Sequence, residues 1–406
     1  FGINRRAAPG WLADKHPCNK VPWFGVRPFP FPRPDELLTL RRSEAVRGAG
    51  LRLQLRARVR RDSPVLARLF VLIVILISIR LLPSVMNSIL LGKSSLRTSR
   101  LAYGCWRIAD TEELGRTVGR AAILAALEAG YTLFDHADIY CGGRAEKAFG
   151  DVLREVGGMR ERVFIATKCG IHWEPGRKQR VDGRPERIRG EVEASLTRLG
   201  TDFVDLLYLH APDPTIPLEE SAGELARLLA AGKTRAVGVS NVSLAQLERF
   251  AAACPLSACQ LHYNMLQREI EAEILPWCRA HGVAMIVYWP LMKGLLAGTM
   301  ARDLVFPTTD SRHKYPMFNG QEFQRNLDFV DALRPAAHRL GCPLPDMVLA
   351  WTAEQPGISC VLFGATSPEQ VHINARARHC RLDDAARQDI AAAIHARGPV
   401  AGRRAV

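Results

Sequence analysis

The sequence predicts an α/β fold in which eight parallel strands alternate with helices and close into a barrel, written (β/α)8. From about residue 86 onward, short runs of apolar, β-forming residues alternate with amphipathic helical patterns. Polar side chains end several of these runs, and in parallel α/β barrels the carboxyl ends of the strands form the reactive face. No Gly-x-Gly-x-x-Gly follows a strand, so a doubly wound dinucleotide-binding sheet is not supported.

Eight apolar runs are the predicted strands. They cover residues 101–104, 131–134, 163–167, 203–209, 236–239, 258–261, 283–287 and 360–363. Helices are predicted between them, for example over residues 185–199 and 218–231, and from Ser243. A hairpin around residues 89–97 precedes the first strand, and we expect it to plug the floor of the barrel.

Residues 1–85 differ from the rest of the chain in composition. They contain 16 Lys and Arg against 5 Asp and Glu, which is +11 of the net charge of +14 of the 406-residue chain and leaves +3 for the remainder. A charge of +14 would normally suggest nucleic acid or an anionic membrane as a partner, but a nearly neutral remainder does not favour nucleic acid. The segment is rich in Pro and Arg and has no helix or strand period. We therefore predict that it is disordered or not native, with Met86 as the natural start.

A membrane tether through residues 66–82 is the alternative interpretation of this segment. Its uninterrupted apolar part, residues 69–79, is shorter than the roughly 20 residues that span a bilayer.

The ten cysteines include no Cys-x-x-Cys pair, which indicates reduced, largely buried thiols and no metal site. A cytoplasmic location is therefore expected.

Three consecutive predicted strands end in an ionisable side chain. Asp135 follows the second strand, Lys168 the third and His210 the fourth. A single polar residue at a strand end is more often a helix cap than a functional residue. Three such residues on successive strands favour a functional site. Neighbouring parallel strands lie about 4.8 Å apart, so the three tips should lie within roughly 10 Å of one another. Tyr140, one short loop beyond the second tip, can fold back over them.

These four side chains have complementary chemical roles. A phenol has a pKa near 10, which is too high for an efficient proton donor at neutral pH, and a nearby Lys168 ammonium is expected to lower it. Asp135 can hold that ammonium in place. His210 can donate a hydrogen bond to a carbonyl oxygen. Tyr140 is then the group left to protonate a developing alkoxide.

The motifs around these residues occur in a fixed order: Asp-x4-Tyr at 135–140, Thr-Lys-x-Gly at 167–170 and Asp-Leu-x-x-Leu-His at 205–210. This order resembles the aldo-keto reductases, from about residue 86 to 374. The resemblance implies a (β/α)8 barrel that reduces an aldehyde or ketone with a nicotinamide cofactor, with Asp135, Tyr140, Lys168 and His210 as the catalytic residues. A small-molecule carbonyl compound is the expected partner, and the sequence does not predict the oligomeric state.

The resemblance also implies residues for the cofactor and the substrate pocket. The amides of Asn241 and Gln260 can pair with a carboxamide. A helix N-terminus capped by Ser367, with Gln370 completing a capping box, can face an anion. The cofactor residues are Ser240, Asn241, Gln260, Tyr288, Pro290, Leu291, Arg312, Gly364, Thr366, Gln370 and Asn374, and the pocket walls are Trp106, His172 and Trp289. His172 begins an irregular polar loop over residues 172–183, and Arg312 belongs to a flexible belt over residues 299–321.

Cofactor choice and activity class stay open from the sequence. NADP(H) is preferred because of Arg312, but NAD(H) is possible since no Lys or Arg stands at Gly364 or Gln370. A non-catalytic nicotinamide-binding regulator, like the potassium-channel β subunits that share the resemblance, is one alternative. A sugar or polyol dehydrogenase working in the reverse direction is another. The presence of His210 completes the four-residue set and favours an enzyme.

Overall fold

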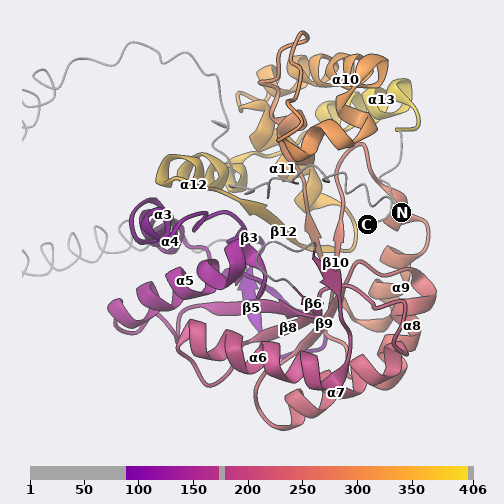
Figure 1. The fold of residues 1–406 in the computed structure, drawn as a ribbon. Helices are drawn as coiled ribbons and strands as arrows, with labels where there is room; N and C mark the ends of the chain where they lie inside the picture. The colour runs from indigo at the N-terminus through magenta and orange to yellow at the C-terminus, as the bar shows by residue number, and fades with distance from the viewer. Residues whose placement is uncertain (1–87, 173–178, 401–406) are drawn as a thin grey trace, which may run out of the picture. The chain divides into compact units, whose positions relative to one another are not determined.

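The computed structural model describes residues 88–172 and 179–400 (Figure 1). Within these residues, eight parallel strands close into a barrel in the order β10-β11-β12-β3-β4-β5-β8-β9. Their bounds are β3 (Leu101–Gly104), β4 (Leu133–Asp135), β5 (Phe164–Cys169), β8 (Leu206–Leu209), β9 (Val237–Ser240), β10 (Ala258–His262), β11 (Ala284–Tyr288) and β12 (Ile358–Gly364). The predicted (β/α)8 barrel is confirmed.

Helices surround the barrel (Figure 1). The helices that follow the eight strands are α4 (Arg120–Glu128), α5 (Arg144–Glu155), α6 (Pro185–Leu199), α7 (Leu218–Ala230), α8 (Leu244–Ala253), α9 (Ile274–His281), α11 (Leu344–Glu354) and α12 (Pro368–Ala375). Two further helices, α10 (Gly320–Arg339) and α13 (Asp384–Arg397), pack against each other. Short helical turns are α3 (Glu112–Leu114), η1 (Gly115–Gly119), η2 (Tyr140–Gly143), η3 (Glu269–Glu271), η4 (Met292–Ala297), η5 (Ser311–Lys314), η6 (Pro316–Phe318) and η7 (Arg376–His379).

Local sequence signals explain where several helices begin and end. Helix α6 has Pro185 in its first turn and ends at Gly200, whose φ of 68° is in the left-handed region that favours glycine. Its bounds agree with the prediction. Helix α8 begins at a complete capping box, in which the Ser243 side chain and the Gln246 side chain each bond to the other's backbone N–H.

Most predicted strands end one or two residues later in the structure. Lys168 and Ser240 therefore lie inside β5 and β9 and not after them. The predicted irregular loop over residues 172–183 contains two short strand segments, while residues 182–183 are irregular as predicted. There β6 (Ile171–His172) and β7 (Arg180–Val181) form an antiparallel pair, and residues 173–178 lie outside the described part of the chain. The predicted belt over residues 299–321 contains η5 and η6.

Side chains that point into the barrel follow the two-residue period of its strands. The buried residues of this inner cluster include Ala102, Leu133, Ala166, Leu206, Tyr208, Ala236, Ala258, Ala284, Ile286, Cys360 and Leu362. Two positions after Leu133, Ala166 and Ala258 come Asp135, Lys168 and Gln260, which are 1–2% exposed. The same inward-facing columns therefore change from apolar to polar at the carboxyl end of the barrel.

A hairpin closes the opposite end, as predicted. Strands β1 (Ser88–Leu90) and β2 (Arg97–Ser99) pair antiparallel, and the turn between them carries Leu91 and Leu96, which join the inner cluster. Gly92, with φ +56°, lies so close to the start of β10 and β11 that an added Cβ would lie 2.2 Å from the Ser257 carbonyl oxygen. Only glycine fits this approach without a shift of the backbone.

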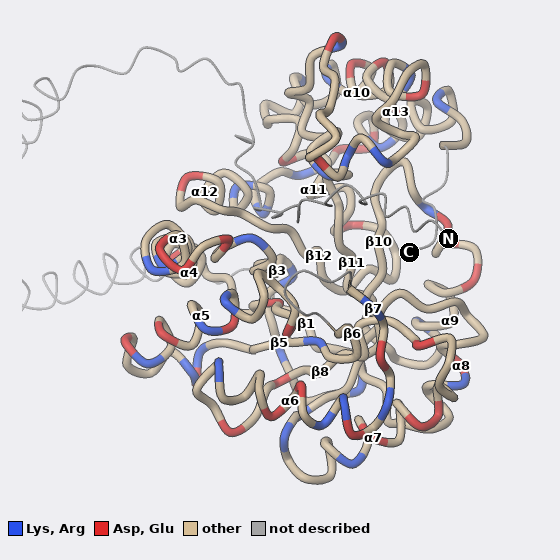
Figure 2. Tube along the Cα trace, in the orientation of Figure 1, with Lys and Arg blue, Asp and Glu red and all other residues tan. Residues whose placement is uncertain are grey.

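Basic and acidic residues are interspersed along the outer helices (Figure 2). Among residues 88–172 and 179–400, no helix is long and apolar enough to cross a membrane. The predictions for residues 1–85, including the start at Met86 and the tether at residues 66–82, lie outside the described residues.

Candidate active site at the carboxyl end of the barrel

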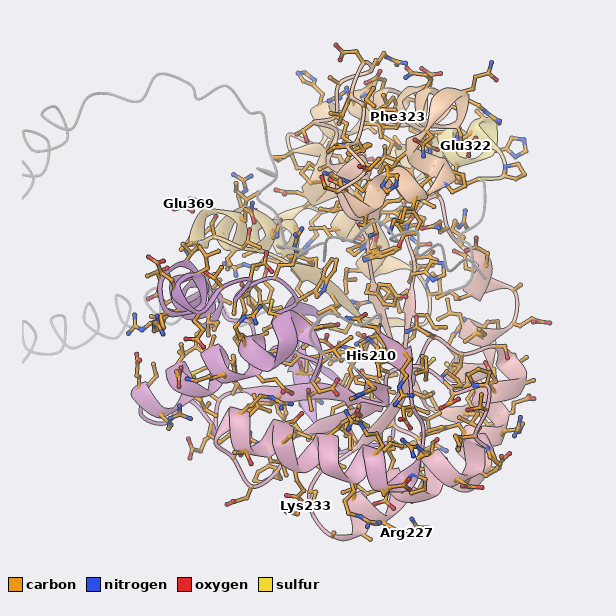
Figure 3. The ribbon with its side chains drawn as sticks, in the orientation of Figure 1. His210, Arg227, Lys233, Glu322, Phe323 and Glu369 are labelled. Atoms are coloured by element: carbon orange, nitrogen blue, oxygen red, sulfur yellow. The ribbon has the colours of Figure 1, made fainter. Side chains whose placement is uncertain are left out.

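The four predicted catalytic side chains lie together at the carboxyl end of the strands. The Lys168 Nζ atom is 2.5 Å from Asp135 Oδ1 and 3.0 Å from the Tyr140 hydroxyl oxygen. The His210 ring is edge-on to the Tyr140 ring, with 6.1 Å between the ring centroids. Figure 3 shows His210 over the strands in the middle of the view. The spacing predicted from the strand order is thus realised.

The loop that carries Tyr140 is fixed to the neighbouring strand. The backbone N–H of His136 donates to the Ala166 carbonyl at 2.8 Å, and that of Asp138 donates to the Lys168 carbonyl at 3.2 Å. The Lys168 ammonium in turn donates to the His136 carbonyl at 2.8 Å. Tyr140 begins the turn η2 directly after these contacts, so its position is set by β5 as well as by β4.

Gln260 supports Asp135 from the far side of the barrel. Its Nε2 donates to Asp135 Oδ2 at 2.8 Å, while Lys168 occupies Oδ1. Both oxygens of the buried carboxylate are therefore satisfied, which compensates for the cost of burying its charge. This contact uses one N–H of the Gln260 amide, so its predicted role as a partner of a carboxamide stays a prediction.

Burial governs the acidity of Tyr140. It raises the pKa of the phenol to about 12, although the Lys168 charge acts in the opposite direction. The expectation that the ammonium would lower the pKa below its ordinary value is therefore wrong in its net effect. Burial also acts to lower the pKa of Lys168, but Asp135 and Tyr140 outweigh it and raise that pKa above its usual value. At neutral pH the phenol is protonated and the amine is charged.

His210 is neutral at physiological pH. Burial, with a smaller contribution from Lys168, holds the pKa of His210 well below its usual value. Its backbone is anchored on both sides, because its N–H donates to the Cys169 carbonyl and its carbonyl accepts from Asn241 Nδ2, each at 2.8 Å. A neutral imidazole has one N–H to donate, which suits a hydrogen bond to a carbonyl oxygen.

The predicted nicotinamide-binding residues form a hydrogen-bonded group beside this site. The Tyr288 hydroxyl donates to Asn241 Oδ1 at 2.7 Å, and Asn241 Nδ2 donates to Ser240 Oγ at 3.2 Å. Ser240 Oγ donates to the Gln260 carbonyl at 2.8 Å. Ser240 is therefore part of the strand tips and not a helix cap, since Ser243 caps α8.

Two residues after strand tips have a left-handed backbone. Asn241 follows β9 with φ 58°, and Trp289 follows β11 with φ 59°. Asparagine adopts this conformation readily, but tryptophan rarely does, so the backbone at Trp289 is strained. Such strain gathers at functional sites, where surrounding contacts hold it in place. After Trp289, Pro290 is buried and Leu291 is half-buried as the chain turns into η4.

Two of the three predicted pocket walls lie near a lysine that the sequence reasoning did not select. The Lys293 ammonium is 4.4 Å from the Trp289 ring centroid, 4.6 Å from that of Tyr315 and 5.9 Å from that of Trp106. It also donates to Ser311 Oγ at 3.3 Å. Lys293 therefore joins both tryptophans to the segment around η5. The signal in the sequence was a cation four residues after Trp289.

His172 has a different neighbour from the other predicted pocket residues. Its Nδ1 is in hydrogen-bond contact with the Arg187 guanidinium on α6. Arg187 also lines a cavity of about 240 Å³ between α6 and the loop after β4. None of the four catalytic side chains lines this cavity. The contact with Arg187 therefore does not support the predicted place of His172 in the substrate pocket.

The predicted adenosine-binding residues surround the start of α12. Ser367 caps the helix by accepting from the Gln370 N–H, but the Gln370 side chain accepts from the backbone N–H and the hydroxyl of Thr366. The predicted capping box is therefore incomplete. Gly364 and Thr366 are exposed, and Asn374 is half-buried on the same helix. These groups are open to a ligand.

Arg312 is engaged within its own segment. Its guanidinium pairs with both carboxylate oxygens of Asp310, at 2.6–3.1 Å, and lies 4.3 Å from the Phe306 ring centroid. The side chain is buried, at 9% exposure. The preference for NADP(H) is based on Arg312 as a partner of the 2′-phosphate, and the pairing with Asp310 does not favour that role.

The residues present fit a nicotinamide dinucleotide. The Asn241 amide and the hydroxyl groups of Ser240 and Tyr288 lie at the tips of β9 and β11, on the same face of the barrel as the Tyr140 phenol, which suits a carboxamide held next to a proton donor. The capped N-terminus of α12 offers backbone N–H groups to an anion.

Comparison with known proteins agrees with this geometry. The family model for the aldo/keto reductase family matches residues 100–395. The chain is 35% identical over 303 residues to the aldo-keto reductase YhdN of Bacillus subtilis (strain 168), covering 74% of this chain and 91% of that protein. It is 36% identical over 318 residues to the NADH-specific methylglyoxal reductase of Escherichia coli (strain K12), covering 74% and 96%.

Solved structures give the same result. The glycerol dehydrogenase AKR11B4 from Gluconobacter oxydans superposes with a TM-score of 0.72 at 33% identity, covering 79% of this chain and 98% of that one. The aldo-keto reductase AKR11C1 from Bacillus halodurans in its holo form gives a TM-score of 0.63 at 27% identity, covering 76% and 96%. The chain therefore belongs to the aldo/keto reductase family and has the fold of an oxidoreductase.

Proposed function

We propose that the protein reduces an aldehyde or ketone with NADH or NADPH and that Tyr140 is the proton donor. One hydrogen bond carries this proposal. Lys168 Nζ donates to the Tyr140 hydroxyl oxygen at 3.0 Å, so it uses a lone pair of that oxygen and leaves the phenolic proton for another acceptor. A substrate carbonyl beside Tyr140 and His210 is that acceptor.

The roles of the residues follow from their contacts. The nicotinamide, when bound, supplies the hydride. Tyr140 passes its proton to the substrate oxygen, which becomes a stronger base than a phenolate as the hydride arrives. Lys168 stabilises the phenolate left behind, and Asp135 keeps the ammonium within reach. His210 orients the carbonyl oxygen from the edge of the Tyr140 ring.

Oxidation of a polyol is the second candidate, since one similar structure is a glycerol dehydrogenase. In that direction Tyr140 must first lose its proton and act as a base. Because burial raises the pKa of Tyr140 to about 12, the phenolate is scarce at neutral pH and oxidation should accelerate with rising pH. A phenol that is protonated at neutral pH therefore favours reduction over oxidation at that pH.

Small polar carbonyl compounds are the proposed substrates, because one relative is a methylglyoxal reductase. The preference for NADP(H) stays a prediction. The pairing of Arg312 with Asp310 does not favour it, and that same relative is NADH-specific. A cytoplasmic location likewise stays a prediction.

The test is cofactor oxidation by the purified full chain. NADH and NADPH are each supplied with methylglyoxal, glyceraldehyde and a simple ketone, and NAD⁺ and NADP⁺ with glycerol. We expect carbonyl-dependent oxidation at pH 7 to exceed glycerol oxidation. Tight binding of the reduced cofactor without turnover on any of these compounds would instead support the non-catalytic regulator.

A further inference from the structure

Two cysteines outside the active site lie close together. The Sγ atoms of Cys342 and Cys380 are 2.7 Å apart, although the residues are 38 positions apart in the sequence. Both are free thiols, as are the other seven cysteines of residues 88–172 and 179–400. Cys342 is half-buried in the turn between α10 and α11, and Cys380 is buried directly after η7.

The backbone holds both residues in place. The Cys342 N–H donates to the Ala337 carbonyl at the end of α10, and the Cys380 N–H donates to the Ala377 carbonyl within η7, each at 3.2 Å. Arg376 at the start of η7 forms an ion pair with Asp346 of α11 at 3.6 Å. The two segments are therefore already joined by a second contact, and little movement is needed to reach the about 2.05 Å of a disulfide bond.

We propose that Cys342 and Cys380 are a redox pair that a hydroperoxide converts to a disulfide. The Cys342 thiolate attacks the peroxide, the O–O bond breaks, and the sulfur becomes a sulfenic acid while water is released. The Cys380 sulfur then attacks this sulfur, the S–S bond forms, and the departing hydroxide leaves as water. Overall the two thiols lose two electrons and two protons, and hydrogen peroxide is reduced to two waters.

Accessibility and proximity set the order of these steps. Cys342 is the half-buried member and meets the oxidant first, whereas buried Cys380 resolves the intermediate. Burial raises the pKa of both thiols, so little thiolate is present and the attack on peroxide is slow. Once the sulfenic acid forms on Cys342, the adjacent Cys380 sulfur converts it to a disulfide.

A second cysteine pair provides an internal comparison. The Cys278 thiol also lies near enough to Cys259 to raise the pKa of that thiol, but both residues are 0% exposed. Proximity is thus shared by the two pairs, and access to solvent differs. Oxidation should therefore select Cys342 and Cys380.

The disulfide would close a loop that contains α11, β12 and α12. Such a link restricts the unfolded chain, so the oxidised protein should melt roughly 3–5 °C higher than the reduced protein. This effect does not depend on the proposed carbonyl reduction.

The experiment treats the reduced full chain with hydrogen peroxide, blocks remaining thiols with N-ethylmaleimide, and maps the cysteines by mass spectrometry. We expect a peptide pair joined through Cys342 and Cys380, with Cys259 and Cys278 blocked only after denaturation. A sulfinic acid on Cys342, with Cys380 still free to be blocked after denaturation, would overturn the proposal.

Serine variants separate the link from general oxidation damage. Cys342→Ser and Cys380→Ser should each lose the crosslinked peptides and the rise in melting temperature. Cys254→Ser is the matched control, since this buried cysteine lies outside both pairs, and it should keep both effects. An equal rise in melting temperature in Cys342→Ser would contradict the assigned pair.

Discussion

The two ends of the barrel are built from the same inward-facing columns but have opposite character. At the floor, the hairpin turn places Leu91 and Leu96 against apolar residues, and both are at most 1% exposed. At the carboxyl end, Asp135 and Lys168 are equally buried, yet they are charged and paired. At the floor, burial of apolar side chains stabilises the fold. At the rim, the buried side chains are ionisable, and their contacts hold them in fixed positions for the site.

Only two residues along a strand separate a side chain of the apolar core from a side chain of the site. On β4 and β5, one step of the two-residue period leads from Leu133 to Asp135 and from Ala166 to Lys168. If the two ends are independent, changes at the rim should affect turnover most, and changes at the floor should affect stability alone.

Lys168→Met should give the largest effect. Loss of the ammonium removes stabilisation of the Tyr140 phenolate, and we expect kcat/KM for carbonyl reduction to fall by about 10²–10⁴, or roughly 3–5 kcal/mol. It also leaves Asp135 buried without its cation, which should cost about 3–5 kcal/mol of unfolding free energy.

The double variant Lys168→Met with Asp135→Asn distinguishes these two effects. It should recover most of the stability in urea denaturation and none of the activity, because the buried charge is gone but the catalytic cation is still absent. Recovery of activity would contradict the role of Lys168.

Leu91→Ala should give the next largest effect, on stability alone. Removing this fully buried side chain from the barrel floor should lower the free energy of unfolding by about 2–5 kcal/mol and leave kcat within twofold. Leu90→Ala is the matched control, since Leu90 is 49% exposed and its loss should change little. A fall in kcat that parallels the fall in stability would show that the two ends are coupled.

Acid should affect the rim more than the floor. Burial, followed by Lys168, lowers the pKa of His136 to about 3, and both ring nitrogens lack a hydrogen-bond partner. A depressed pKa contributes stability above pH 6.5 that is lost as the pH falls toward about 3. His136→Leu should therefore flatten urea-denaturation stability between pH 6.5 and 4, while changing it by less than about 1 kcal/mol at pH 7.

Leu91→Ala, which changes no titratable group, should shift the same pH profile downward without changing its shape. A His136→Leu profile as steep as that of the unaltered protein would contradict the assignment of this histidine.

Ser367→Ala should give the smallest effect. Loss of the α12 cap should cost about 1 kcal/mol of stability and, if this end holds the adenosine part of the cofactor, should weaken cofactor binding. Ser243→Ala removes the equivalent cap of α8 and should cost a similar free energy without changing cofactor affinity. If Ser367→Ala and Ser243→Ala bind the cofactor equally well, the N-terminus of α12 does not contribute to cofactor binding.

The sequence predicted the rim because strand order alone brings Asp135, Lys168 and His210 to adjacent tips. It did not predict that Gln260 holds Asp135, because the two residues are 125 positions apart and meet only when the barrel closes. The contact between His172 and Arg187 likewise depends on where α6 packs.

Other differences are matters of magnitude and local pairing. Whether Lys168 or burial controls the pKa of Tyr140 depends on how completely the phenol is enclosed, which strand patterns do not reveal. Asp310 lies only two residues before Arg312, but the sequence does not show whether Arg312 pairs with this carboxylate or with a phosphate.

Replacement of Tyr140 by phenylalanine tests the central claim most directly. The Tyr140→Phe variant keeps the ring and removes only the hydroxyl that accepts from Lys168. Its cofactor affinity, followed by quenching of protein fluorescence, should stay within about twofold, while carbonyl reduction should fall by at least about 10²-fold. A variant that binds cofactor normally and reduces carbonyls at nearly the original rate would show that another group delivers the proton.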